Sequence, residues 1–103
     1  DYLFGQMIER GISLFNEGKY DETMEWILPI IEYLENDPLF TVSYYEALFL
    51  RGKFYAVKGD TKQATTDYNS ILLFVGEFDS IQALGEIPIT DVRAALSEIE
   101  RVI

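Results

Sequence analysis

Apolar residues recur every three or four positions along most of this chain, which is the spacing of one face of an α-helix. The pattern predicts an all-α fold built from five helices. Residues 76–89 contain two glycines and a proline, and they are predicted to form a connector with room for one helical turn around 80–84. The helices are expected over about residues 2–17, from Tyr20 to a turn at 36–38, and over 43–58, 61–75 and 90–103.

Local signals mark the ends of these helices. Gly18 and Gly59 follow the first and third helices, and glycine readily adopts the left-handed conformation that ends a helix. Pro29 lies inside the second helix and is expected to kink it, because its ring clashes with the carbonyl four residues back. The side chains expected to cap helices are Ser43 with Glu46, Asp60 with Gln63, and Thr90.

The third and fifth helices have apolar surfaces that must be buried against other parts of the chain. The third is apolar nearly all round, which is typical of a helix packed on several sides in the middle of a stack. The fifth has a single apolar stripe, and we expect it to dock on the fourth helix near Leu72 and Val75. The residues of this stripe are Val92, Ala95, Leu96, Ile99 and Ile103.

The first four helices contain an internal repeat. Arg10-Gly11 is followed by Gly18, and the same arrangement returns 41 residues later as Arg51-Gly52 followed by Gly59. The segment ERGISLFNEGKYDETMEWI thus aligns with LRGKFYAVKGDTKQATTDY. A fixed period of this size indicates a repeat architecture, in which each unit buries its apolar face on its neighbour.

Each copy is predicted to be two antiparallel helices, and it resembles the tetratricopeptide repeat, a helix–turn–helix unit of 34 residues. The first copy fits at Gly11, Gly18 and Tyr20, but it has Thr23 where the family prefers alanine. The longer period here implies a longer second helix or inter-repeat loop. The second copy is the closer match, through RGKFYAVKGDTKQATTDYN and through Leu48, Gly52, Tyr55, Gly59, Ala64 and Tyr68.

The resemblance implies one domain over residues 1–103 with the fold of an α-α superhelix, a tetratricopeptide-like solenoid. Its glycines at 11 and 52, with Ala64, would let the two helices of a repeat approach closely. The expected parts are repeat 1 over about 2–37, repeat 2 over about 41–75, the connector 76–89 and a capping helix over 90–103.

The resemblance also implies a binding surface, because the first helix of each repeat lines the concave face in this family. The result is an apolar groove with one cation, suited to the apolar side chains of a peptide. The alternative is that these side chains pack against the C-terminal part of the chain or another subunit. The family's clamp for chaperone C-termini is not expected, because Ile8, Ile12 and Phe49 stand where it needs Lys and Asn. The groove residues carried over are Ile8, Ile12, Phe15, Glu46, Phe49, Lys53 and Val57.

Three further features have both a structural and a functional interpretation. Arg10 and Arg51 stand where arginine is ordinary in the family, so a structural role is expected. The lysines at 53, 58 and 62 are expected to neutralise the acidic first repeat rather than to form a site. Trp26 is either a binding anchor or a packing residue.

Composition and charge narrow the functional classes. The net charge is −10, with −7 in residues 1–40, +1 in residues 41–76 and −4 in residues 77–103, so nucleic acid is not an expected partner. The chain has no histidine and no cysteine, which removes the commonest general base and metal ligands. Carboxylate pairs such as Asp21 with Glu25 are expected on solvated faces, so no enzyme, cofactor or metal is predicted. A carboxylate-based hydrolase is the remote alternative.

These observations predict a protein-interaction or scaffold module that binds a peptide or a protein. The alternative is self-assembly, a homo-oligomer formed through the same apolar surfaces. No long apolar run or signal peptide is visible, so membrane insertion is not expected. The absence of cysteine fits the cytoplasm, although a periplasmic location is also compatible with it. The sequence begins at Asp1, so we expect a fragment or a processed form.

Overall fold

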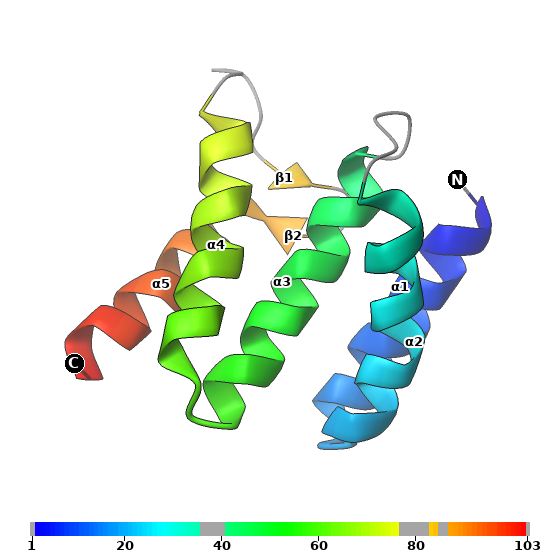
Figure 1. The fold of residues 1–103 in the computed structure, drawn as a ribbon, viewed down its shortest axis with the longest axis horizontal. Coiled ribbons are helices and arrows are strands. Elements are labelled where there is room, and N and C mark those ends of the chain that lie inside the picture. The colour runs from blue at the N-terminus through cyan, green and yellow to red at the C-terminus, as the bar shows by residue number, and fades with distance from the viewer. Residues whose placement is uncertain (1, 36–40, 77–82, 85–86, 103) are drawn as a thin grey trace.

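Five helices and one short strand pair make up the computed structural model, which describes residues 2–35, 41–76, 83–84 and 87–102 (Figure 1). The prediction of an all-α domain is confirmed. The helices are α1 (Tyr2–Asn16), α2 (Tyr20–Leu34), α3 (Thr41–Val57), α4 (Thr61–Val75) and α5 (Ile89–Val102), and the strands are β1 (Ala83–Leu84) and β2 (Ile87–Pro88).

The helices pack in chain order as two hairpins and a covering helix. α1 packs on α2, and α3 packs on α4; α2 and α1 both contact α3, and α5 packs on α4 (Figure 1). The radius of gyration is 12.8 Å, close to the roughly 13 Å expected of a globular domain of about 100 residues. The stack is therefore folded around one core rather than drawn out.

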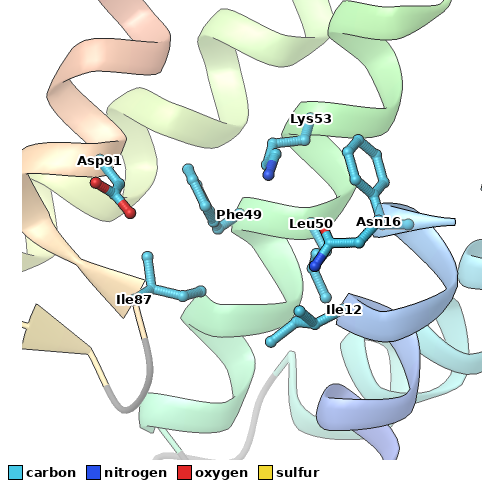
Figure 2. A pocket seen from close by; sticks show the side chains of 8 residues that line it. Ile12, Asn16, Phe49, Leu50, Lys53, Ile87 and Asp91 are labelled. Carbon is cyan, nitrogen blue, oxygen red and sulfur yellow. The ribbon is translucent and has the colours of Figure 1, made fainter. Parts of the chain in front are cut away.

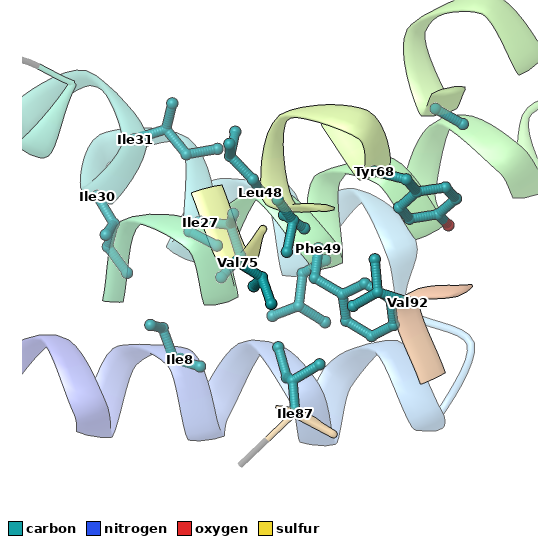
Figure 3. Packing of buried hydrophobic residues seen from close by; sticks show 14 of the residues in the cluster. Ile8, Ile27, Ile30, Ile31, Leu48, Phe49, Tyr68, Val75, Ile87 and Val92 are labelled. Atoms are coloured by element: carbon teal, nitrogen blue, oxygen red, sulfur yellow. The ribbon is translucent and has the colours of Figure 1, made fainter. Parts of the chain in front are cut away.

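That core runs through all five helices and β2 (Figure 3). Buried side chains come from both hairpins, and α5 contributes Ile89, Val92 and Ile99. Val75 belongs to the same cluster, and Leu72 and Leu96 pack against it. The prediction that the last helix docks on the fourth is confirmed. Ile103 lies outside the described residues.

Some predicted boundaries shift by one or two residues. α3 begins at Thr41, so Ser43 lies inside its first turn instead of before it, and α5 begins at Ile89, which places Thr90 inside that helix.

The connector pairs Leu84 with Ile87 in an antiparallel ladder. The turn expected around 80–84 is wrong for residues 83–84, which form a strand; the rest of it lies outside the described residues. Burial of Ile87 explains why β2 is held against the helices.

The two hairpins end their first helices in the same way. Gly18 and Gly59 have φ angles of 80° and 85°. The next residue donates its N–H five residues back in each case, from Lys19 to the carbonyl of Leu14 at 2.9 Å and from Asp60 to that of Tyr55 at 2.9 Å. These are Schellman motifs 41 residues apart. Asp60 also caps α4, because its side chain accepts a hydrogen bond from the N–H of Gln63 at 3.2 Å.

Within each hairpin, a glycine lets the two helices touch. A Cβ built on Gly11 would lie 2.8 Å from Cδ1 of Ile27, and one on Gly52 would lie 2.6 Å from Cε1 of Tyr68. Both distances are shorter than van der Waals contact, so the expected close approach is confirmed. Thr23 can take the place of alanine there, because its buried hydroxyl donates to the carbonyl of Lys19 at 2.9 Å.

Replacing Gly52 with alanine is expected to destabilise the domain, whereas Gly5→Ala is expected to stabilise it. A Cβ at Gly5 has no neighbour within 4 Å, so this variant gains only the helix propensity of alanine, about 1 kcal/mol. At Gly52 that gain is outweighed by overpacking against the buried Tyr68 ring, which costs about 1–3 kcal/mol. Urea denaturation measures the difference. Equal stability of the two variants would contradict the close approach of α3 and α4.

A buried ion pair ties the second hairpin together. Nε and one terminal nitrogen of Arg51 donate to the two carboxylate oxygens of Asp67, at 2.9 and 2.7 Å. The Asp67 side chain is only 3% exposed and that of Arg51 is 25% exposed. The hydrogen bond to Asp67 raises the pKa of Arg51, and burial opposes that rise. In the first hairpin, Arg10 is exposed, and Trp26 occupies the position equivalent to Asp67 and is 41% exposed.

Candidate binding groove

Two neighbouring cavities form a groove along one face of the helices. Their volumes are about 170 and 230 Å³, and both are lined by Phe15 of α1 and Lys53 of α3. We call them the first and the second cavity, and together they are the groove. The first is also lined by Ile12, Asn16, Phe49, Leu50, Ile87 and Asp91. The second is also lined by Ala56, Val57, Tyr68, Ala95, Glu98 and Ile99.

Three helices that are distant in sequence build most of this groove, and Tyr68 of α4 and Ile87 of β2 complete its lining. Figure 2 shows Ile12 and Asn16 of α1 on one side, Asp91 and Ile87 on the other, and Phe49 and Lys53 of α3 between them. α3 is thus the floor, and α1 and α5 are the walls. Phe49, Lys53 and Val57 reach the floor because residues four apart lie on one face of a helix.

The ammonium group of Lys53 lies on aromatic rings at the junction of the two cavities. Its Nζ atom is 4.7 Å from the ring centroid of Phe15 and 5.5 Å from that of Phe49. Both distances are within the range of a cation–π interaction. These contacts hold the positive charge in the middle of the groove rather than free in solvent.

Two carboxylates lie on the α5 wall, one at each cavity. Asp91 lines the first cavity, and Glu98 lines the second. Glu98 accepts a hydrogen bond from Arg101 at 3.2 Å, but the two side chains are 71% and 79% exposed, so this pair is weak. Both carboxylates are therefore accessible to a partner.

Tyr68 of α4 also lines the second cavity. Burial raises the pKa of its phenol, and the charge of Asp67 raises it further. The phenol therefore stays neutral, and Tyr68 contributes a ring surface and no negative charge.

The structure brings together five of the seven groove residues expected from the sequence. These are Ile12, Phe15, Phe49, Lys53 and Val57. Phe49 is 8% exposed and belongs to the same core cluster as Ile87 and Val92 of the C-terminal part of the chain. For Phe49, this burial is compatible with the alternative interpretation, in which the C-terminal part of the chain packs against it.

The structure does not place Ile8 and Glu46 in the groove. They are 1% and 6% exposed and line neither cavity. Each lies toward the N-terminal half of its helix. For α3, the β1–β2 pair packs beside this half (Figure 1). Ile8 belongs to the core cluster.

The other expected features are placed as follows. Lys58 lies 3.8 Å from Asp21, so it does offset a charge of the first repeat, while Lys62 is exposed. Trp26 lies on the outer side of α2 and not in the core.

The sequence analysis did not predict the C-terminal lining of the groove, namely Ile87, Asp91, Ala95 and Glu98. A signal was present for the three residues of α5, because Ala95 belongs to the apolar stripe of this helix and Asp91 and Glu98 are adjacent to stripe residues in sequence.

The groove offers apolar surface, one fixed cation and two carboxylates. Within the described ranges, no three acidic side chains come together closely enough to hold a metal ion. The same part of the chain contains no helix long and apolar enough to cross a membrane. These groups can hold a partner through apolar contacts and ion pairs.

Comparison of the chain with protein-family models, with curated proteins and with solved structures gives no match.

Proposed function

We propose that this domain is a tetratricopeptide-like interaction module whose groove binds an apolar segment of another protein. The observation that carries this proposal is the groove, in which three helices distant in sequence place aromatic rings and a fixed lysine around two neighbouring cavities. Aromatic side chains in partly enclosed sites are the residues that contribute most to binding energy at interfaces.

The repeat geometry supports the tetratricopeptide-like arrangement. Both hairpins share a helix-ending motif and a glycine contact in the same register. α1 and α3, the first helices of the two hairpins, both line the groove, and α5 packs on α4, as the first helix of a third repeat would. In the proposed arrangement, the groove corresponds to the concave face on which the family binds its partners.

The size of the cavities favours side chains over a cofactor. Small-molecule sites commonly measure about 300–1,000 Å³, and each cavity here is smaller. One or two apolar side chains fill such a volume. A hydrolase is not proposed, because a general acid needs a carboxylate shielded from water, and Asp91 and Glu98 are exposed.

Self-association is the second candidate function. Trp26 and Tyr33 are 41% and 71% exposed and lie seven residues apart, on one face of α2. Against this candidate, Glu22, Glu25 and Glu32 are exposed on the same helix, so two copies facing each other would bring like charges together. Light scattering over a range of protein concentrations, with Trp26→Glu as the comparison, tests it.

Val57→Arg is expected to weaken partner binding at least tenfold without unfolding the domain. Val57 is 50% exposed and lines the second cavity, so arginine fills the cavity and adds charge while the core stays intact. The loss corresponds to one good interface contact. Peptides selected from a display library against the unmodified domain are the probes, and fluorescence anisotropy gives their dissociation constants.

Leu73→Arg is the matched control. Leu73 is 76% exposed on α4 and lines neither cavity, so the same substitution there changes the charge equally. We expect selected peptides to bind this variant as they bind the unmodified domain. Equal losses in the two variants, or no enrichment of peptides, would contradict binding in the groove.

A further inference from the structure

We infer that the partner of the groove is an amphipathic helix that carries two basic residues seven positions apart, with apolar residues between them. This inference rests on the proposed function, because it takes the groove to be the binding site. It adds the chemistry and the spacing that the partner must have.

The first step is the spacing of the carboxylates on α5. Asp91, Ala95 and Glu98 are separated by four and three residues, so they lie on one face of the helix. Seven residues of α-helix rise about 10.5 Å. Asp91 and Glu98 therefore mark the two ends of the groove, at the first and the second cavity. A partner helix that lies along α5 covers the same distance with seven of its own residues. Its residues i and i+7 can therefore face Asp91 and Glu98.

The second step is charge complementarity. Both carboxylates are exposed, and the only cation that lines the groove, within the described residues, is Lys53 at its centre. A partner is therefore attracted if its cations lie at the two ends and repelled if they lie in the middle. The net charge of −10 attracts basic segments over a longer range.

The third step is the apolar middle. Lys53 lies on the rings of Phe15 and Phe49, so the centre of the groove presents hydrocarbon and aromatic surface around a fixed charge. Apolar residues at positions i+3 and i+4 of the partner face this surface. Helical walls favour a helical occupant, because the side-chain ridges of one helix fit the grooves between the ridges of another.

A second copy of this chain does not fit the requirement. Among its eight lysines and arginines, only Arg51 and Lys58 are seven residues apart. Arg51 is bound by Asp67 through two hydrogen bonds, so it is not available. A second copy of residues 1–103 is therefore not the partner.

The test uses labelled alanine-rich peptides of about 15 residues. The first has lysine at i and i+7 and leucine at i+3 and i+4. The second has the same composition, but its second lysine moves to i+5, which turns that lysine away from the binding face. The third replaces both lysines with glutamate. At about 0.1 M salt, we expect the first peptide to bind about five- to tenfold tighter than the second, and the third to bind most weakly.

Paired variants of the domain identify the carboxylates responsible. In Asp91→Asn with Glu98→Gln, the first and second peptides are expected to bind equally. In the control, Glu22→Gln with Glu25→Gln, two exposed charges are removed from α2 and the preference remains. A preference that survives the first pair of substitutions, or disappears with the control pair, overturns the inference.

The remaining outcomes separate this inference from the proposed function. If the first two peptides bind the unmodified domain equally and Val57→Arg weakens both, the groove binds but the spacing of basic residues is wrong. If a proline-containing extended peptide with lysines three apart binds more tightly, the partner is a strand and not a helix. If no peptide binds at up to about 1 mM, or if Val57→Arg has no effect on those that do, the proposed site itself is wrong.

Discussion

Arg51→Ala is expected to destabilise the domain by about 3–5 kcal/mol, because it leaves the carboxylate of Asp67 buried without its partner. Asp67→Ala should cost less. The side chain of Arg51 is 25% exposed, so its guanidinium can turn to water, whereas the 3% exposed side chain of Asp67 has no such route. Urea unfolding, followed by circular dichroism, gives the free energy of unfolding of each variant.

The repeat provides a matched control for this prediction. Arg10 is the equivalent residue of the first hairpin, and it is exposed on α1 with Trp26 at the position of Asp67. Arg10→Ala is expected to change the stability by less than about 0.5 kcal/mol. The double variant Arg51→Met with Asp67→Leu should recover most of the loss, because the unpaired charge is gone. Equal effects at Arg10 and Arg51 would show that the ion pair has no special role.

The all-helical fold could be predicted because its strongest signals are local. The glycines that end α1 and α3 have φ angles of 80° and 85°, and few other residues adopt that conformation. Asp60 caps α4 as its sequence pattern predicts. Ser43 shows why such a pattern can mislead. Residues three apart share a face anywhere in a helix, so Ser43 with Glu46 fits a capping box although α3 begins at Thr41.

The groove could be predicted only in part, because periodicity gives the face of a helix but not what covers it. Phe49, Lys53 and Val57 were expected together and lie together. Ile8 and Glu46 share the same periodicity but are buried. Whether such a residue is buried or lines the groove depends on how neighbouring elements converge, and that is a property of the tertiary structure.

The acidic wall of the groove is the clearest case of a feature that local patterns cannot place. Asp91 and Glu98 follow a connector that the sequence describes only as a break between helices. They reach Phe15 and Lys53 because the apolar stripe of α5 packs on α4. The stripe predicts which side of α5 is buried, but the direction in which the helix runs is set by packing.

Val92→Asp is expected to be the most damaging single change in α5. Val92 is fully buried in the cluster that contains Phe49 and Ile87 (Figure 3), and an aspartate there has no cation to pair with among the apolar side chains of that cluster. A buried unpaired charge costs several kcal/mol, so we expect a loss of at least about 3 kcal/mol or the release of α5 from the stack. Thermal unfolding and hydrogen exchange distinguish the two results, because release of α5 exposes its amides while those of α1–α4 stay protected.

The control for Val92→Asp is Ala94→Asp, which adds the same charge two residues away on the exposed side of α5. Its stability is expected to stay within about 0.5 kcal/mol of the unmodified domain. Release of α5 removes the wall that carries Asp91 and Glu98, so peptide binding in the groove should be lost if Val92→Asp releases this helix, and it should be kept with Ala94→Asp. An unchanged melting temperature for Val92→Asp would contradict the docking of α5, because a helix that packs on nothing tolerates a charge on either side.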